Sequence, residues 1–188
     1  MLELLRNHPI GFGELRVAAV FFIACCVGLL LPKGWFSLIS WRLSGVYRVL
    51  TYSFIHGNLA HFIGNLSILG IITVVYAAVE FPPLGATPTL AVALMGGALG
   101  GGLTSFFVNI PGTQTVGASA ALHGATAFFI VRALTSGKLT IISTVLLLVV
   151  FGLVSIVDFL PHRTEDGSKV SWQAHLGGAL GGGLVAFV

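Results

Sequence analysis

The chain has 188 residues, of which 56% are hydrophobic and only 8% are charged. A water-soluble enzyme is excluded, because so few charged side chains cannot solvate the surface of a globular domain. Nine Lys and Arg against six Asp and Glu give a net charge of +3 without a basic cluster, so we expect no nucleic-acid partner.

Long apolar segments follow one another along the chain. A helix needs about 20 apolar residues to cross the hydrocarbon core, because every backbone amide must be hydrogen-bonded within its own segment. The segments are continuous rather than alternating, which argues against a β-barrel. We therefore expect an all-α membrane protein in which residues 1–188 form a single six-helix domain. The expected helices span approximately 15–31, 59–79, 90–108, 116–134, 139–157 and 172–188.

The loop between the first two expected helices, residues 32–58, is rich in aromatic side chains. Because Trp and Tyr favour the boundary between lipid and water, we expect this loop to lie at the membrane interface. The Lys and Arg residues divide four against five between the two faces, so charge leaves the orientation open. The aromatic residues of the loop are Trp35, Trp41, Tyr47 and Tyr52.

Residues 96–103 and 177–184 are identical octapeptides, Gly-Gly-Ala-Leu-Gly-Gly-Gly-Leu, in the third and sixth expected helices. Glycines four residues apart let two helix backbones approach closely. The repeat therefore indicates close helix packing. A phosphate-binding loop is not indicated, because no strand precedes either segment.

Polar side chains of the second, fourth and sixth helices fall in one layer of the membrane. These even-numbered helices all enter from the same face. Ser119 and His175 each lie three residues past the start of their expected helix, roughly 5 Å below the surface. His61 and Asn65 lie four residues apart, on one face of the second helix.

This set of side chains is suited to hydrolytic acyl transfer. A serine hydroxyl needs a base to take its proton, and the imidazole of His175 can serve Ser119 in that way. Asn65, His61 and the backbone amide of Ser119 are donors suited to a developing oxyanion. We expect a dyad rather than a triad, because the layer contains no carboxylate.

Metal binding is the competing use of the histidines His56, His61, His123 and His175. No acidic or thiolate ligand accompanies them, and the His-x4-His pair lacks the adjacent Glu of a zinc protease. We therefore expect no metal.

Three motifs occur in order along the chain. They are Tyr47-Arg48 with His56, His61 and Asn65; Gly117-Ala118-Ser119-Ala120; and Ala174-His175-x-x-Gly178. They resemble the Trp-Arg with His-x4-His-x3-Asn, Gly-x-Ser-Gly and Ala-His-x-x-Gly motifs of rhomboid intramembrane serine proteases. One motif alone would be weak, but three in this order on these helices are a specific signal.

The resemblance implies a protease that cleaves transmembrane segments of other membrane proteins near their ends, in the lipid bilayer and without a cofactor. It implies Ser119 as nucleophile, His175 as general base, and His61 with Asn65 as oxyanion-side donors. It also implies a multi-pass protein of a bacterial cell membrane with its catalytic face outward.

The same resemblance gives supporting roles to other motif residues. His56 would be a structural loop residue, Arg48 an anchor of the first loop, and Gly117 part of the nucleophile motif. Three residues depart from the pattern: Tyr47 replaces a tryptophan, Ala120 replaces a glycine, and His123 stands where the family has an aromatic ring that stacks on the base. We expect His123 to pack against His175.

Two other functions stay open. Ala120 and His123 are compatible with a catalytically inactive rhomboid-like protein that binds membrane helices. A small transporter could use the polar layer for conduction, but it should have polar residues reaching both faces, and the inner halves of the even-numbered helices have almost none.

Overall fold

The computed structural model describes residues 9–78, 89–135, 145, 156–163, 167 and 169–188. The elements in chain order are α2 (Pro9–Leu30), α3 (Lys33–Phe36), β1 (Leu38–Ile39), η1 (Leu43–Gly45), α4 (Arg48–Thr51), η2 (Tyr52–Phe54), α5 (Leu59–Ala78), α6 (Thr89–Val108), β2 (Gln114–Thr115), α7 (Ser119–Thr135), η3 (Ile156–Phe159) and α9 (Trp172–Val185).

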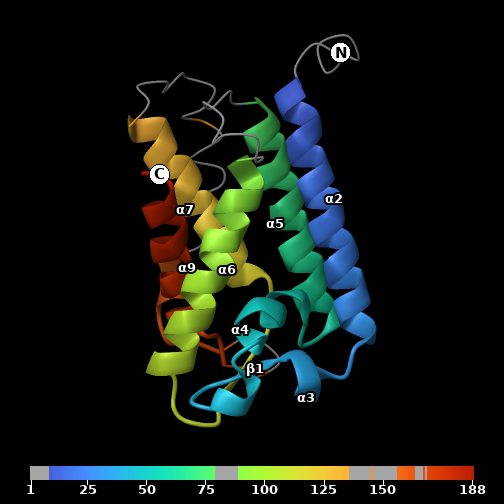
Figure 1. Cartoon of the computed structure of the whole chain (residues 1–188), viewed down its shortest axis with the longest axis vertical. Coiled ribbons are helices and arrows are strands. Elements are labelled where there is room, and N and C mark those ends of the chain that lie inside the picture. Colours follow the sequence, from blue (N-terminus) through green and yellow to red (C-terminus); the bar gives the residue numbers. More distant parts are fainter. Residues whose placement is uncertain (1–8, 79–88, 136–144, 146–155, 164–166, 168) are drawn as a thin grey trace.

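The long helices stand side by side in one bundle. Figure 1 shows α2 and α5 on one side, α7 and α9 on the other, and α6 between them. α2, α5 and α6 contain apolar stretches long enough to cross a membrane. These helices confirm the predicted helical membrane bundle. The span predicted at 139–157 lies almost entirely outside the described residues, so the count of six stays a prediction.

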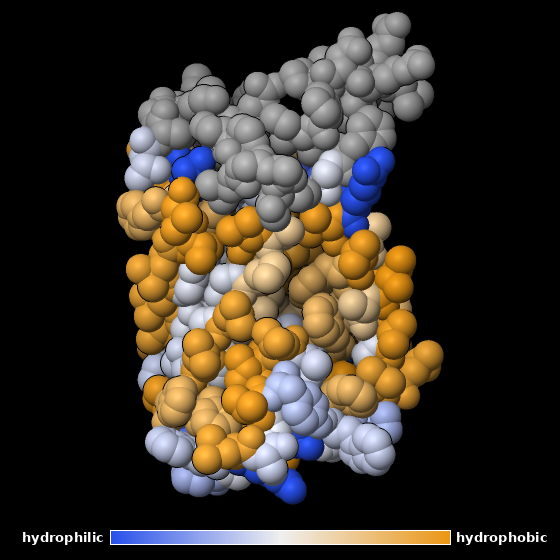
Figure 2. Space-filling model, viewed as in Figure 1, coloured by the Kyte–Doolittle hydropathy of each residue, from blue (hydrophilic) through white to orange (hydrophobic). Residues whose placement is uncertain are grey.

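The apolar surface of the bundle matches a bilayer environment. Figure 2 shows hydrophobic side chains covering the middle of one face, with hydrophilic side chains toward its lower and upper ends. On α2, the large side chains of Val20, Ile23 and Leu30 are exposed. Apolar side chains exposed around the middle of a helical bundle are solvated by lipid in a membrane protein.

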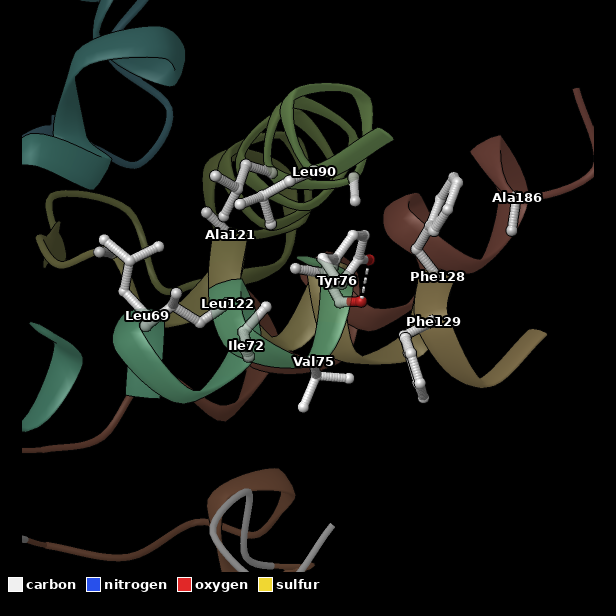
Figure 3. Packing of buried hydrophobic residues seen from close by; sticks show 14 of the residues in the cluster. Leu69, Ile72, Val75, Tyr76, Leu90, Ala121, Leu122, Phe128, Phe129 and Ala186 are labelled. Carbon is white, nitrogen blue, oxygen red and sulfur yellow. Dashed lines mark hydrogen bonds between the residues drawn. The ribbon is translucent and has the colours of Figure 1, made fainter. Parts of the chain in front are cut away.

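The bundle core joins α5, α6 and α7. Figure 3 shows Leu69, Ile72 and Tyr76 of α5 packed near Leu122 and Phe128 of α7. The hydroxyl of Tyr76 donates a hydrogen bond of 2.6 Å to the carbonyl of Ala125, drawn as a dashed line in the figure. That bond satisfies the one polar atom which the tyrosine brings into the core.

The repeated octapeptides bring α6 and α9 together. A Cβ atom on Gly100 would lie 2.9 Å from the Cα of Gly181, and one on Gly96 would lie 3.1 Å from the carbonyl oxygen of Gly181. Such distances leave no room for side chains between the two backbones. The repeated glycines therefore allow α6 and α9 to pack closely, as their spacing indicates.

Glu14 connects α2 to the start of α6. Its carboxylate is buried and accepts hydrogen bonds of 2.9 Å from the backbone amides of both Thr89 and Leu90. The first amides of a helix have no intrahelical acceptor, and the positive end of the helix dipole favours an anion there. This contact could not be predicted from the sequence, because a carboxylate near a helix start also suits the membrane surface.

The short elements between α2 and α5 gather at one end of the bundle, the lower end in Figure 1. β1 pairs antiparallel with β2, placing Leu38 opposite Thr115. Trp35 and Trp41 are exposed, as expected of interfacial anchors. Tyr52 is not such an anchor: it is fully buried, and its hydroxyl donates to the carbonyl of Ala98 at 2.9 Å.

Candidate active site

Ser119 is the first residue of α7, three residues later than the helix start predicted at 116. The delay has a local cause in Gly117, whose φ of +117° is a backbone conformation that side-chain-bearing residues rarely adopt. The amide of Gly117 donates to the carbonyl of Tyr52 at 3.1 Å instead of joining a helix. Ser119 therefore lies at a helix N-terminus, where its own amide has no intrahelical acceptor.

His175, in the first turn of α9, lies against Ser119. Its Nε2 is 2.8 Å from the Oγ of Ser119, and its Nδ1 is 2.9 Å from the backbone carbonyl of Asp158. A carbonyl only accepts, so Nδ1 carries the proton of the neutral ring and Nε2 holds the lone pair. The serine hydroxyl consequently donates to Nε2, which is the arrangement a general base requires.

His123 covers one face of the His175 ring. The two imidazoles are nearly parallel, with centroids 4.3 Å apart and an interplanar angle of 10°. The Nδ1 of His123 donates to the carbonyl of Ser119 at 2.7 Å, one helical turn back. The ring of Phe159 meets His123 edge-on at 5.1 Å. His123 thus holds the base in place without contacting the serine hydroxyl.

Asn65 and His61 approach from α5. Asn65 is buried, and its Nδ2 has no hydrogen-bond partner among the described residues. His61 lies directly against Gly117: a Cβ there would be 2.6 Å from the Cε1 of His61. Gly117 is therefore required twice, for its positive φ and for this close approach. The amide of His61 is itself fixed by the Oδ1 of Asn58 at 2.8 Å, which caps the start of α5.

His56 and Arg48 lie outside the pair and support the loop. His56 is buried, with its ring edge-on to both His61 and Phe62 at 5.3 Å. Burial, and to a lesser extent the neighbouring His61, lowers the pKa of His56 to about 4, so its ring is neutral at pH 7. Arg48 points an Nη1 at the carbonyl of Ser37, 3.5 Å away, and its guanidinium lies over the Tyr47 ring.

Ala120, which replaces a motif glycine, points toward the contact between α7 and α6. It is fully buried in a cluster that includes Tyr52 and Ala174. Its methyl group points at Gly101 of α6, where no second Cβ would fit. The glycine on α6 therefore leaves the space that the methyl group of Ala120 fills.

Asp158 is the residue that sequence reasoning missed. The sequence predicted no carboxylate in the polar layer, but that of Asp158 lies next to it. The structure places its carbonyl on His175 and its Oδ2 3.9 Å from the Nε2 of His123. A main-chain contact from a short 3-10 segment leaves no pattern in the sequence. The available signal was an acidic residue directly before an aromatic one at the end of an apolar run.

No group of three His, Cys, Asp or Glu side chains with metal-binding geometry occurs within the described ranges. Each of the histidines near Ser119 is instead hydrogen-bonded to a main-chain carbonyl or packed against another ring. The arrangement is therefore suited to proton transfer between Ser119 and His175.

The fold and these contacts define a helical membrane protein with a serine–histidine pair at one end of its bundle. A family model described as the rhomboid domain matches residues 43–188. The match covers well over half of the chain, which therefore belongs to the rhomboid family, as the three motifs predicted. Neither the curated proteins nor the solved structures give a match. Rhomboid membership and the apolar helices make it an integral membrane protein.

Proposed function

We propose that the chain is an intramembrane serine endopeptidase that cleaves transmembrane segments of other membrane proteins. The observation that carries the proposal is the 2.8 Å contact between the Nε2 of His175 and the Oγ of Ser119, with the other ring nitrogen occupied by a carbonyl. Ser119 is partly exposed, whereas His175 is buried. A substrate can therefore reach the nucleophile while the base stays shielded.

The reaction follows from these positions. His175 takes the Ser119 proton as Oγ attacks the scissile carbonyl, giving a tetrahedral intermediate and an imidazolium. The imidazolium then gives that proton to the leaving amine. In the second half of the reaction, His175 takes a proton from water, which hydrolyses the acyl-enzyme. No cofactor takes part in either half of the reaction.

The negative oxygen of the intermediate requires donors fixed in advance. The Nδ2 of Asn65 fits, because it is buried without a hydrogen-bond partner among the described residues. The amide of Ser119, at the helix N-terminus, is a second donor. His61, held against Gly117, is the third. Loss of one such donor typically lowers the reaction rate by roughly 10²–10³-fold.

The six-helix domain, a bacterial cell-membrane location and an outward catalytic face belong to the same proposal. The interfacial aromatic loop lies at the same end of the bundle as Ser119, so both face the same side of the membrane. Accessibility of a cysteine introduced at the exposed Ser44 to an impermeant maleimide on intact cells tests this orientation.

The decisive experiment is covalent labelling of the detergent-solubilised protein with a fluorophosphonate, together with cleavage of a reporter transmembrane segment. Ser119 should be modified, and Ser119→Ala should neither label nor cleave. Ser67→Ala is the matched control, because Ser67 is exposed on α5 and donates to the carbonyl of Ile63 in the same helix. A chain that binds the reporter helix without labelling or cleavage would instead be the inactive helix-binding relative.

A further inference from the structure

Asp158 contacts the candidate active site through both its main chain and its side chain. Its carbonyl accepts the Nδ1 proton of His175 at 2.9 Å. Its carboxylate lies between two imidazoles, with Oδ2 3.9 Å from the Nε2 of His123 and Oδ1 3.8 Å from the Nε2 of His162. The carboxylate thus lies next to the ring that packs on His175.

The reaction generates a positive charge where water is scarce. When His175 takes the serine proton it becomes an imidazolium, although its side chain is buried. A buried charge without a counter-charge is costly. Asp158 is the acidic residue that the described part of the chain places beside this ring.

We propose that Asp158 is a positioning residue of the Ser119–His175 pair, with its carbonyl selecting the reactive tautomer and its carboxylate supplying the negative charge that stabilises the imidazolium. This inference rests on the proposed protease function. The carboxylate does not touch the serine or the substrate. It acts on the base, so its removal should change the pH dependence of the reaction as well as the rate.

The ionisable groups facing His175 come from three elements. They are His123 on α7, Asp158 in η3 and His61 on α5. α6, which packs extensively on α9, contains no ionisable residue. Asp158 is the one anion in this set, and its neutral amide analogue keeps the same backbone carbonyl. Asp158→Asn therefore removes the charge while leaving the main-chain hydrogen bond in place.

The test is the rate of fluorophosphonate labelling of Ser119 between about pH 5 and 9 in detergent. In Asp158→Asn the acidic limb of the profile should move to lower pH by on the order of one unit, because a base without its counter-anion gives up its proton more readily. The plateau rate should fall on the order of tenfold, because a neutral side chain at this position no longer stabilises the imidazolium of His175. Asp158→Glu, which retains the charge, should keep the acidic limb in place.

His162→Gln is the control for loop integrity, because His162 flanks the carboxylate from the solvent side without contacting His175. It should change the plateau less than Asp158→Asn does. Should Asp158→Asn not fold, Asp158→Ser gives the same comparison. If the acidic limb of the pH profile did not move in Asp158→Asn or Asp158→Ser, the inference would be overturned. Absence of labelling in the unaltered chain would overturn the proposed function, and this inference with it.

Discussion

The imidazole of His123 lies parallel to that of His175, with 4.3 Å between ring centroids, while its Nδ1 is bonded to the carbonyl of Ser119. One histidine therefore links the nucleophile's main chain to the face of the base. A ring in this position restricts the rotation of His175 by packing. We expect it to take no part in proton transfer, because its Nδ1 is engaged and its Nε2 points toward Asp158.

We therefore expect His123→Tyr to retain activity and His123→Ala to lower it. An aromatic pair is worth about 0.5–1.5 kcal/mol, so the alanine variant should cleave the reporter up to about tenfold more slowly. Cleavage rates of both variants between about pH 6 and 9 check this. If His123→Tyr were as inactive as Ser119→Ala, the imidazole itself would be needed, and the base would have been assigned to the wrong histidine.

Ser119 and His175 should behave as one unit. Ser119→Ala and His175→Ala should each abolish reporter cleavage, and the double variant should be no worse than either, because groups that cooperate in one step are not additive. The measurement is single-turnover cleavage by the three variants and the unaltered chain. Substantial turnover by either single variant would contradict the assignment.

Hydropathy predicted the long helices because a backbone segment in lipid must form its hydrogen bonds within itself, as a helix does. α5 and α6 begin and end within one residue of the predicted limits. Ser119 and His175 could be paired from sequence, since helices entering from one face bring equal depths together. The contacts of Tyr52, Glu14 and Asp158 could not be predicted. Each depends on where a loop or a neighbouring helix end lies, which periodicity does not encode.

Glu14 should contribute to the stability of the bundle without affecting the active site. Glu14→Gln removes a charged acceptor shared by two amides at the start of α6, which should cost about 2 kcal/mol. Thermal unfolding in detergent measures the loss. Fluorophosphonate labelling below the unfolding temperature should stay unchanged, because Ala120, next to Ser119, packs on Gly101, about three helical turns along α6 from Thr89. An unchanged Tm would show that the amides find another acceptor.

Metal chelators should leave activity intact. The histidines near Ser119 have carbonyl and ring partners, and the described residues offer no set of three ligands. Reporter cleavage should therefore survive EDTA and phenanthroline. Loss of cleavage on chelation, with recovery on adding zinc, would indicate a metalloprotease instead.

His56 should make the folded protein sensitive to acid. Its ring is buried, and its Nε2 has no hydrogen-bond partner among the described residues. The pKa of His56 is lowered from 6.5 to about 4, first by burial and then by His61. Between these two values the unfolded chain binds more protons than the folded one, so the stability difference is fully present above pH 6.5 and is lost as the pH falls toward 4.

The size of this loss follows from the same two values. One pKa unit corresponds to about 1.4 kcal/mol, so His56 should cost the folded state roughly 2 to 3 kcal/mol between pH 7.5 and 4.5. His56→Gln keeps a donor for the carbonyl of Phe54 but does not titrate. Denaturant unfolding at the two pH values should show the unaltered chain losing roughly 2 to 3 kcal/mol more than this variant. The other ionisable residues are the same in both proteins, so their contributions cancel in the comparison. Equal losses would mean that the His56 ring is hydrated or rearranges when protonated, and that its neutral form is not required by the fold.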